Sequence, residues 1–385
     1  MNYDFDTVYD RRNTNSVKYK KHPRYPSRSD LIPLWVADMD FKTAPEILQA
    51  IESVVAHGIF GYTEPDDAYF RSIMLWYKKR FGVNLEQEWL VPCDSVMSGI
   101  ATAIRAFTKK KDAVLIFQPV YYPFSNVIVQ NERRVIVSEL ASDGIKYTID
   151  FNDFESKIIR HRVKALLFCS PHNPVGRVWD EEELIHVADI CAKHGVMIIS
   201  DEIHADLVFK RHVPFTAVAG NASVNIVILT SFTKTFNLAG IQGAHFIIPD
   251  PELRAELKKV LCAQFSGGLN TVSVAAATAA YQHGEEWLTA LLAYLKENIY
   301  YVVNSFQNTK IKAFLPEGTY LMWLDCRALG LSDDELEAFF VEDCGVWLNS
   351  GCIFGNGGSG FMRMNIACPR ATLEKAVDRI LRKIE

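Results

Sequence analysis

The sequence has no long hydrophobic run. Its apolar stretches, such as Ala113–Phe117 and Ala165–Cys169, are of strand length, and none approaches the ~20 apolar residues that a membrane helix requires. Residues 1–21 are rich in charged and aromatic side chains and lack the apolar core of a secretory signal. We therefore expect a cytoplasmic protein without a membrane partner.

The sequence also lacks a basic excess and a cysteine motif. The chain has 41 lysines and arginines and 46 aspartates and glutamates, so it has no surplus of positive charge for binding nucleic acid. We therefore exclude nucleic acid as a partner. None of the 8 cysteines forms a C-x-x-C pair, and several lie inside apolar runs. This usage is typical of reduced cysteines packed as small hydrophobic side chains. We therefore expect neither disulfides nor a metal site.

The middle of the chain alternates short apolar runs with amphipathic stretches. The runs Val163–Ser170 and Val196–Ser200 predict strands that are buried on both faces. Between them, Asp180–His194 predicts a helix that ends at Gly195. Such alternation predicts an α/β fold with a mostly parallel sheet flanked by helices. Further strands are expected at Val224–Ser231 and Ala244–Ile248.

The pattern changes after about Gln282. A long helix predicted at Glu285–Phe306 precedes a mixture of strands and helices, which indicates a smaller α+β domain at the C-terminus. We expect a large domain over residues 46–283, a small domain over 284–385, and an N-terminal segment, 1–45, that packs on the small domain or on a partner subunit. The remaining elements of the small domain are expected at Tyr320–Asp325, Asp333–Val341, Phe361–Ile366 and Arg370–Ile384.

Polar side chains follow three of the predicted strands. Asn173 comes after the first of these strands, Asp201 after the second and Lys234 after the third. In an open parallel sheet, ligands bind beyond the carboxyl ends of the strands. We therefore expect these three side chains to converge on one polar site.

Four segments resemble a known group of enzymes. The segment Ser231–Gly240 is similar to the cofactor-binding motif of fold-type I enzymes that use pyridoxal 5′-phosphate (PLP). The segments Trp35–Phe41, Asp201–Leu207 and Gly318–Arg327 resemble those of the MalY/PatB-type cystathionine β-lyases, a subgroup of the class I/II aminotransferase-like superfamily. The resemblance covers essentially the whole chain, and it implies the fold-type I architecture, a PLP cofactor and a homodimer.

The resemblance implies catalytic roles for three residues. Lys234 would hold PLP as a Schiff base and later act as the general base for the substrate's α-proton. Asp201 would keep the pyridine nitrogen protonated, which makes the ring an electron sink, and Tyr121 would stack on that ring. Taken alone, the same residues would be interpreted as a surface lysine, a helix N-cap and a core aromatic side chain.

Other residues match cofactor contacts of the family. Asn173 is expected at the phenolic oxygen of PLP, and His204 lies either there or in a structural position nearby. Tyr62 matches a tyrosine that reaches the phosphate from the other subunit, which implies active sites shared within a homodimer. Further phosphate contacts, at a helix N-terminus and at hydroxyl groups, are expected from Ser95, Val96, Met97, Ser231 and Thr233.

The expected phosphate turn departs from the family pattern. Asp94 lies where glycine is common, and a carboxylate beside a dianion is unfavourable unless it turns away, for instance as the helix N-cap. Gln242 occupies the place of an arginine in aspartate aminotransferases. We therefore expect phosphate binding to rely on neutral donors.

Substrate contacts are also implied by the resemblance. Arg363 matches the arginine that binds the substrate's α-carboxylate, a task that suits a bidentate guanidinium group, and the alternative is an outward-facing strand arginine. Ala37, Asp38 and Asn349 are expected to line the same pocket.

The resemblance favours β-elimination. The leading hypothesis is a PLP-dependent C–S β-lyase that converts L-cystathionine, cysteine or related S-conjugates to a thiol, pyruvate and ammonia. The shared residues do not separate this reaction from transamination, so a class I/II aminotransferase is the first alternative. A regulatory binding protein that retains a PLP site is the second, although the sequence contains no dedicated recognition motif for that role.

Overall fold

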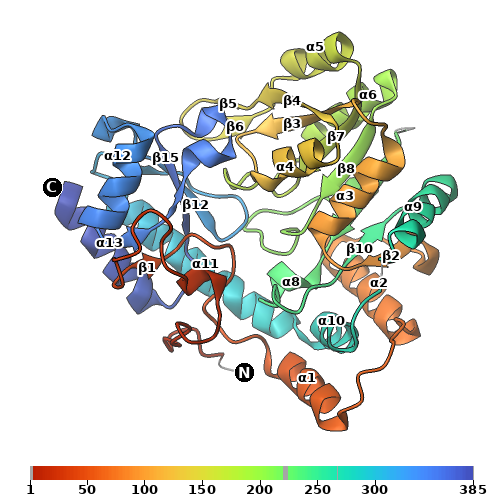
Figure 1. Cartoon of the computed structure of the whole chain (residues 1–385), viewed down its shortest axis with the longest axis horizontal. Helices are drawn as coiled ribbons and strands as arrows, with labels where there is room; N and C mark the ends of the chain where they lie inside the picture. The colour runs from red at the N-terminus through yellow and green to blue at the C-terminus, as the bar shows by residue number, and fades with distance from the viewer. Residues whose placement is uncertain (1–2, 220–223, 267, 385) are drawn as a thin grey trace.

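A seven-stranded sheet forms the centre of the computed structural model, which describes residues 3–219, 224–266 and 268–384 (Figure 1). The strand order is β2-β10-β9-β8-β7-β3-β4. Neighbours from β9 to β4 run parallel, whereas β10 pairs antiparallel with both β2 and β9, so the prediction of a mostly parallel sheet is confirmed. The strands are β2 (Leu90–Cys93), β3 (Ala113–Gln118), β4 (Arg134–Glu139), β7 (Val163–Cys169), β8 (Met197–Asp201), β9 (Ile226–Thr230) and β10 (Ala244–Ile247).

Helices cover both faces of this sheet. Alternate side chains of a strand point to opposite faces, and accordingly Ile198 and Ile199 belong to different hydrophobic clusters. The cluster with Ile199 packs against α3 (Val96–Phe107), α4 (Pro123–Gln130) and α9 (Pro251–Ala263). The cluster with Ile198 includes side chains of α1 (Pro45–His57), α2 (Asp67–Phe81), α5 (Phe151–His161), α6 (Glu181–His194), α7 (Phe215–Ala219), α8 (Phe232–Thr235) and α10 (Thr271–His283).

The helix predicted at residues 180–194 illustrates how local sequence fixes its ends. Asp180 is the N-cap of α6, and with Glu183 it forms a capping box that satisfies backbone N–H groups of the first turn. Gly195 ends the helix with φ 63°, a left-handed conformation that glycine adopts at little cost. Both predicted ends are confirmed.

A four-stranded antiparallel sheet, β11-β12-β15-β14, forms the C-terminal region together with α11 (Glu285–Phe306) and α13 (Arg370–Ile384). The helix predicted at 333–341 is shorter than expected. α12 (Asp333–Ala338) passes into a π-helical turn over Phe339–Asp343, in which the N–H of Cys344 donates to the Phe339 carbonyl at 3.0 Å. The strands are β11 (Lys312–Ala313), β12 (Leu321–Asp325), β14 (Asn349–Ser350) and β15 (Phe361–Asn365).

The N-terminal segment packs on this C-terminal region, where the red and blue ends of the chain lie side by side in Figure 1. β1 (Ile32–Pro33) pairs in parallel with β13 (Val346–Trp347), and Arg24 forms ion pairs with Asp334 and Glu337. The boundaries at 45/46 and 283/284 stay predictions. A small hairpin joins β5 (Ala141–Ser142) and β6 (Tyr147–Thr148). Among the described helices, none combines the length and apolarity needed to cross a bilayer.

A buried ion cluster lies within the N-terminal segment. The amine of Lys18, 0% exposed, lies 2.6 Å from Asp40 and 3.6 Å from Asp38. Arg11 binds both carboxylates, each at 2.7 Å. Removing one partner of a buried ion pair leaves a charge without compensation, which is costly in a protein interior. The cluster therefore joins Arg11 and Lys18 to the segment Trp35–Phe41.

We predict that Lys18→Met lowers the free energy of unfolding by about 3 kcal/mol, because Asp40 loses its nearest cation. Urea unfolding at a constant protein concentration measures the change. Arg12→Ala is the matched control, since Arg12 and Asp10 also pair at 2.7 Å but are 69% and 54% exposed. That control should leave the free energy of unfolding almost unchanged, because solvent screens the exposed pair. Equal losses for the two variants would contradict a stabilising role for the buried cluster.

Candidate functional site

A cavity of ≈ 220 Å³ lies at the carboxyl ends of β7, β8 and β9. Parallel strands deliver their following residues to one edge of a sheet, which is why Asn173, Asp201 and Lys234 all line it. Most of the site residues predicted from the sequence meet here. The described lining consists of Ala37, Ser95, Val96, Met97, Tyr121, Cys169, Asn173, Asp201, Ile203, His204, Thr233, Lys234, Ala239, Gln242 and Gly243.

Lys234 projects from the short helix α8. Ser231 caps this helix by accepting a hydrogen bond from the N–H of Thr233 at 3.0 Å, and its hydroxyl donates to the Gly243 carbonyl at 2.6 Å. Ser231 therefore holds α8 and does not line the cavity. The Lys234 amine donates to the Ala37 carbonyl at 2.5 Å. Burial lowers the pKa of Lys234 to about 8, so a neutral amine, able to act as nucleophile or base, is accessible near neutral pH.

Asp201 ends β8 and accepts a hydrogen bond from the N–H of Ile203 at 3.1 Å. Burial raises the pKa of Asp201 to about 7, and the nearby charge of Lys234 opposes that rise. A buried carboxylate is stabilised by a cation placed against it. Asp201 is therefore suited to hold a protonated ring nitrogen.

Arg363 lies on β15 and reaches the same site. Its Nη1 donates to Asn173 Oδ1 at 3.1 Å and its Nη2 to the Trp35 carbonyl at 2.7 Å, whereas its buried Nε has no partner. The residue is 2% exposed, so the alternative of an outward-facing arginine is wrong. Burial lowers the pKa of Arg363 to about 10, which leaves it charged at neutral pH. An unsatisfied cationic donor of this kind suits a carboxylate ligand.

His204 and Tyr121 form two other walls of the cavity. Burial lowers the pKa of His204 to about 3, so the imidazole is neutral, and its buried Nδ1 has no partner. Burial raises the pKa of Tyr121 to about 12, so its phenol is also neutral. The backbone N–H of Tyr121 donates to the Asn173 carbonyl at 3.0 Å, and this bond links Tyr121 to Asn173 in the cavity lining.

The N-terminus of α3 forms the end of the cavity that suits an anion. Ser95 is the N-cap and accepts from the N–H of Ser98 at 3.2 Å, so Asp94 does not cap this helix. Both residue types are good caps, and the chain selects the one directly before the first helical turn. Val96 and Met97 place the first turn of the helix, with its free N–H groups and positive dipole end, at the cavity.

Five predicted site residues lie outside the described cavity lining, namely Asp38, Ser231, Asn349, Arg363 and Tyr62. The Asn349 side chain donates to the Trp35 carbonyl at 2.8 Å, and the Asp38 carboxylate accepts from Arg11 at 2.7 Å. Tyr62 lies on the loop after α1 with its side chain fully exposed. Asn349 and Asp38 therefore hold the segment Trp35–Phe41 within this chain.

Three residues with no role predicted from the sequence also hold the segment Trp35–Phe41 in place. Asn237 accepts from the N–H of Met39 at 2.9 Å and donates to the Phe41 carbonyl at 2.7 Å. Asn365 donates to the Asp38 carbonyl at 2.6 Å, and the Tyr320 hydroxyl donates to the Ala37 carbonyl at 2.8 Å. Asn237 and Tyr320 lie inside segments that carried the resemblance, and Asn365 lies two residues after Arg363. Each donates to a backbone carbonyl, and no sequence pattern marks such a partner.

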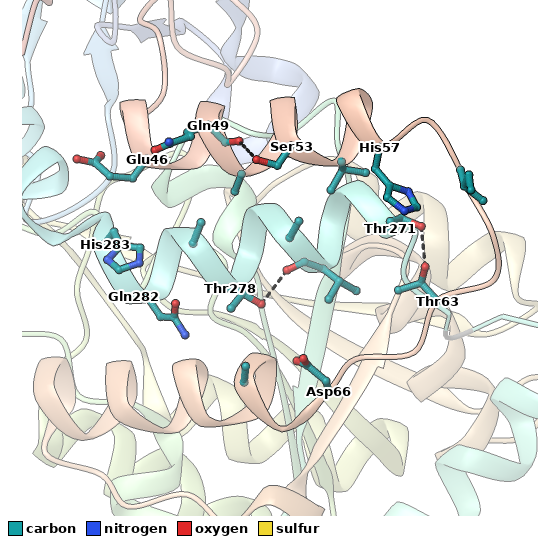
Figure 2. Close-up of a pocket in the computed structure, with 17 residues that line it drawn as sticks. Glu46, Gln49, Ser53, His57, Thr63, Asp66, Thr271, Thr278, Gln282 and His283 are labelled. Carbon is teal, nitrogen blue, oxygen red and sulfur yellow. Dashed lines mark hydrogen bonds between the residues drawn. The ribbon is translucent and has the colours of Figure 1, made fainter.

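A larger cavity of ≈ 850 Å³ lies between α1, α2 and α10 and shares no described lining residue with the first. Figure 2 shows Ser53 and His57 on α1 and Thr278 on α10 at its sides. The residues described in its lining include no lysine or arginine. It therefore lacks an amine such as the one that Lys234 contributes to the smaller cavity.

The smaller cavity fits PLP on three grounds. The Lys234 amine suits the aldehyde, the Asp201 carboxylate suits the ring nitrogen, and the N-terminus of α3 suits the phosphate. The unpartnered Nδ1 of His204 offers one more polar contact to a ligand. No metal-binding group of three or more His, Cys, Asp or Glu side chains occurs among the residues that the structure describes.

Comparisons with known proteins show the family of the chain. Residues 29–380 match the family "Aminotransferase class I and II". The chain is 37% identical over 382 residues to cystathionine beta-lyase PatB of Bacillus subtilis (strain 168), covering 98% of each protein. It is 34% identical over 390 residues to protein MalY of Escherichia coli (strain K12), covering 99% of each.

A solved structure extends the agreement to the fold. The crystal structure of cystalysin from Treponema denticola, which contains a PLP cofactor, matches with a TM-score of 0.95 and 36% identity, covering 100% of this chain and 99% of that one. The predicted fold-type I architecture is confirmed. Because the family match spans nearly the whole chain, the protein belongs to the aminotransferase class I and II family.

Proposed function

We propose that the protein is a PLP-dependent C–S β-lyase that cleaves L-cystathionine, and cysteine or related S-conjugates, to a thiol, pyruvate and ammonia. The observation that carries the proposal is the half-buried Lys234, whose amine lies in one cavity with Asp201 and Asn173. Relatives named cystathionine beta-lyase and a solved C-S lyase from Staphylococcus hominis, 33% identical over the whole chain, support the choice of reaction.

In this proposal, residues on four sides of the cavity hold PLP. Lys234 binds its aldehyde carbon, Asp201 faces its ring nitrogen, and Tyr121 packs on its ring. Asn173 and His204 face its phenolic oxygen. The phosphate lies against Ser95, Val96, Met97 and Thr233.

The reaction needs a base, an anchor and an electron acceptor. When bound, PLP supplies a conjugated ring that accepts the electron pair left at the substrate's Cα. Arg363 holds the α-carboxylate through its unpartnered Nε, and Lys234 removes the Cα proton. The Cβ–S bond then breaks with departure of a thiolate, and water converts the remaining fragment to pyruvate and ammonia. Return of the proton to the cofactor instead would give transamination, the alternative reaction.

We predict that the purified protein with PLP releases thiol and pyruvate from cystathionine when no keto acid is present. Lys234→Ala should reduce kcat at least about 10³-fold, because both the covalent anchor and the base are lost. Lys193→Ala is the control, since this exposed lysine pairs with Glu155 at the surface, and it should keep wild-type activity. Strict dependence on a keto-acid acceptor would favour the aminotransferase.

We predict opposite effects of Asp201→Asn on activity and on stability. The pKa of Asp201 is raised to about 7 from 3.8 in the PLP-free protein. Between these two values the unfolded chain releases a proton that the folded protein keeps, so this group makes stability fall as pH rises. At pH 8 the PLP-free variant should therefore be more stable than wild type by at least about 1 kcal/mol.

This gain should vanish at about pH 4, where the wild-type carboxyl also carries its proton in the folded state. With PLP bound, kcat should fall at least about 10-fold, because the ring nitrogen loses its counter-charge. Urea unfolding at the two pH values and steady-state assays measure both effects. An unfolding free energy with the same pH dependence in variant and wild type would contradict the burial argument.

We also propose a homodimer with shared active sites in the cytoplasm. Loop residues Ile59, Phe60 and Tyr62 are 71%, 62% and 113% exposed, and clustered exposed apolar side chains of this kind mark an association surface. In the proposal, Tyr62 of each subunit completes the phosphate site of the other. All 8 cysteines are free, which is consistent with a reducing compartment.

Subunit mixing tests the shared site. Tyr62→Ala and Lys234→Ala are each expected to have little activity. A heterodimer of the two variants would contain one intact site, so refolding an equal mixture should restore about one quarter of wild-type activity. No recovery would mean that Tyr62 acts within its own subunit, and a fully active Tyr62→Ala variant would mean that Tyr62 has no role at the site. Sedimentation at micromolar concentration should show a dimer, and a monomer would refute the proposal directly.

A further inference from the structure

Asp206 is a buried carboxylate that the proposed reaction does not use. It lies in the loop after β8 and is 7% exposed. Its carboxylate accepts hydrogen bonds from Trp76 Nε1 at 3.0 Å, Arg80 Nε at 3.3 Å and Thr235 Oγ1 at 3.0 Å. Arg80 Nη2 also donates to the Asp206 backbone carbonyl at 3.2 Å. One side chain therefore joins α2, the loop after β8 and α8.

Thr235 connects this carboxylate to the helix that carries Lys234. α8 has 4 residues, and so short a helix has too few backbone hydrogen bonds to hold its own position. Ser231 fixes its N-terminal end, and the bond from Thr235 to Asp206 fixes its C-terminal end. Lys234 lines the cavity, whereas Thr235 is 1% exposed and bonds to the protein interior.

We propose that Asp206 is a positioning residue that acts through Thr235 to hold the Lys234 amine in its reactive place. This inference rests on the proposed C–S lyase function. Asp206 and Thr235 do not line the cavity in the described structure, so neither is a catalytic residue. Their contribution is geometric: the bond between them sets the direction from which Lys234 reaches the substrate's Cα.

The negative charge of Asp206 strengthens its hydrogen bond with Thr235. Burial raises the pKa of Asp206, while the Arg80 guanidinium and the hydrogen bonds from Thr235 and Trp76 counteract that rise. A hydroxyl that donates to a carboxylate forms a stronger bond than one that donates to a neutral acceptor. Proton transfer needs this rigidity, since a misplacement of about 1 Å at a reacting group can cost up to about 100-fold in rate.

Thr235→Val tests the inference, because valine keeps the branched shape and removes only the hydroxyl. We expect kcat for cystathionine cleavage to fall about 10-fold with KM changed less than about 2-fold, since Arg363 still anchors the substrate. The rate at which PLP-depleted protein regains its visible absorbance band should fall by a similar factor. Thr235→Ser restores the hydroxyl and should return both quantities to within about 2-fold of wild type.

Trp76→Phe is the matched control. It removes another donor to the same carboxylate but leaves the bond between Thr235 and Asp206 in place. It should lower Tm at least as much as Thr235→Val while kcat and PLP uptake stay at wild-type values. If kcat falls in step with Tm in both variants, or if Thr235→Val keeps wild-type kcat, the positioning role is wrong.

Two further results separate this inference from the function on which it rests. A wild-type protein that takes up PLP but cleaves no cystathionine would overturn the lyase reaction, and the uptake rates of the Thr235 variants would then decide the positioning role. A wild-type protein that takes up no PLP would overturn both.

Discussion

Burial of the Lys234 amine is the constraint on which the rest of the site depends. An amine in a protein interior loses hydration, which lowers its pKa and makes a reactive neutral form accessible. The Ala37 carbonyl accepts its hydrogen bond, and that carbonyl is in place because Asn237 and Asn365 hold the segment Trp35–Phe41 from distant parts of the chain. The reactivity of one side chain thus depends on contacts between the N-terminal, central and C-terminal segments.

The same site contains polar groups that have too few hydrogen-bond or ion-pair partners within the protein. Asp201 has a raised pKa, and buried nitrogens of His204 and Arg363 have no partner. Each costs folding free energy in the absence of a ligand, because buried polar groups are stable only when they are paired. A ligand that pairs with them therefore stabilises the folded protein as it binds. The same incompletely paired groups give the site its affinity for the cofactor and lower the folding stability of the protein when no ligand is bound.

The strand ends could be predicted from the sequence, because unbroken apolar runs define where β7, β8 and β9 stop and so place Asn173, Asp201 and Lys234 at one edge. Side chains that act across the chain could not be predicted. Asn349 donates to the Trp35 carbonyl, a tertiary contact without a periodic signature, and its place in the substrate pocket stays a prediction. The sequence also does not distinguish Asp94 from Ser95 as the N-cap of α3, since both residue types suit the role almost equally.

The parallel pairing of Ile32 with Val346 has a consequence for biosynthesis. A ribosome releases the N-terminal segment long before β13 exists, so β1 and the segment Trp35–Phe41 have no native partner during most of translation. Arg363 and Asn365, which hold that segment, follow their partners Trp35 and Asp38 by 328 and 327 residues. A nascent chain can fold its central sheet early, but the cavity around Lys234 closes only after β15 has been synthesised. Truncated products that lack β15 therefore lack a closed site for the cofactor.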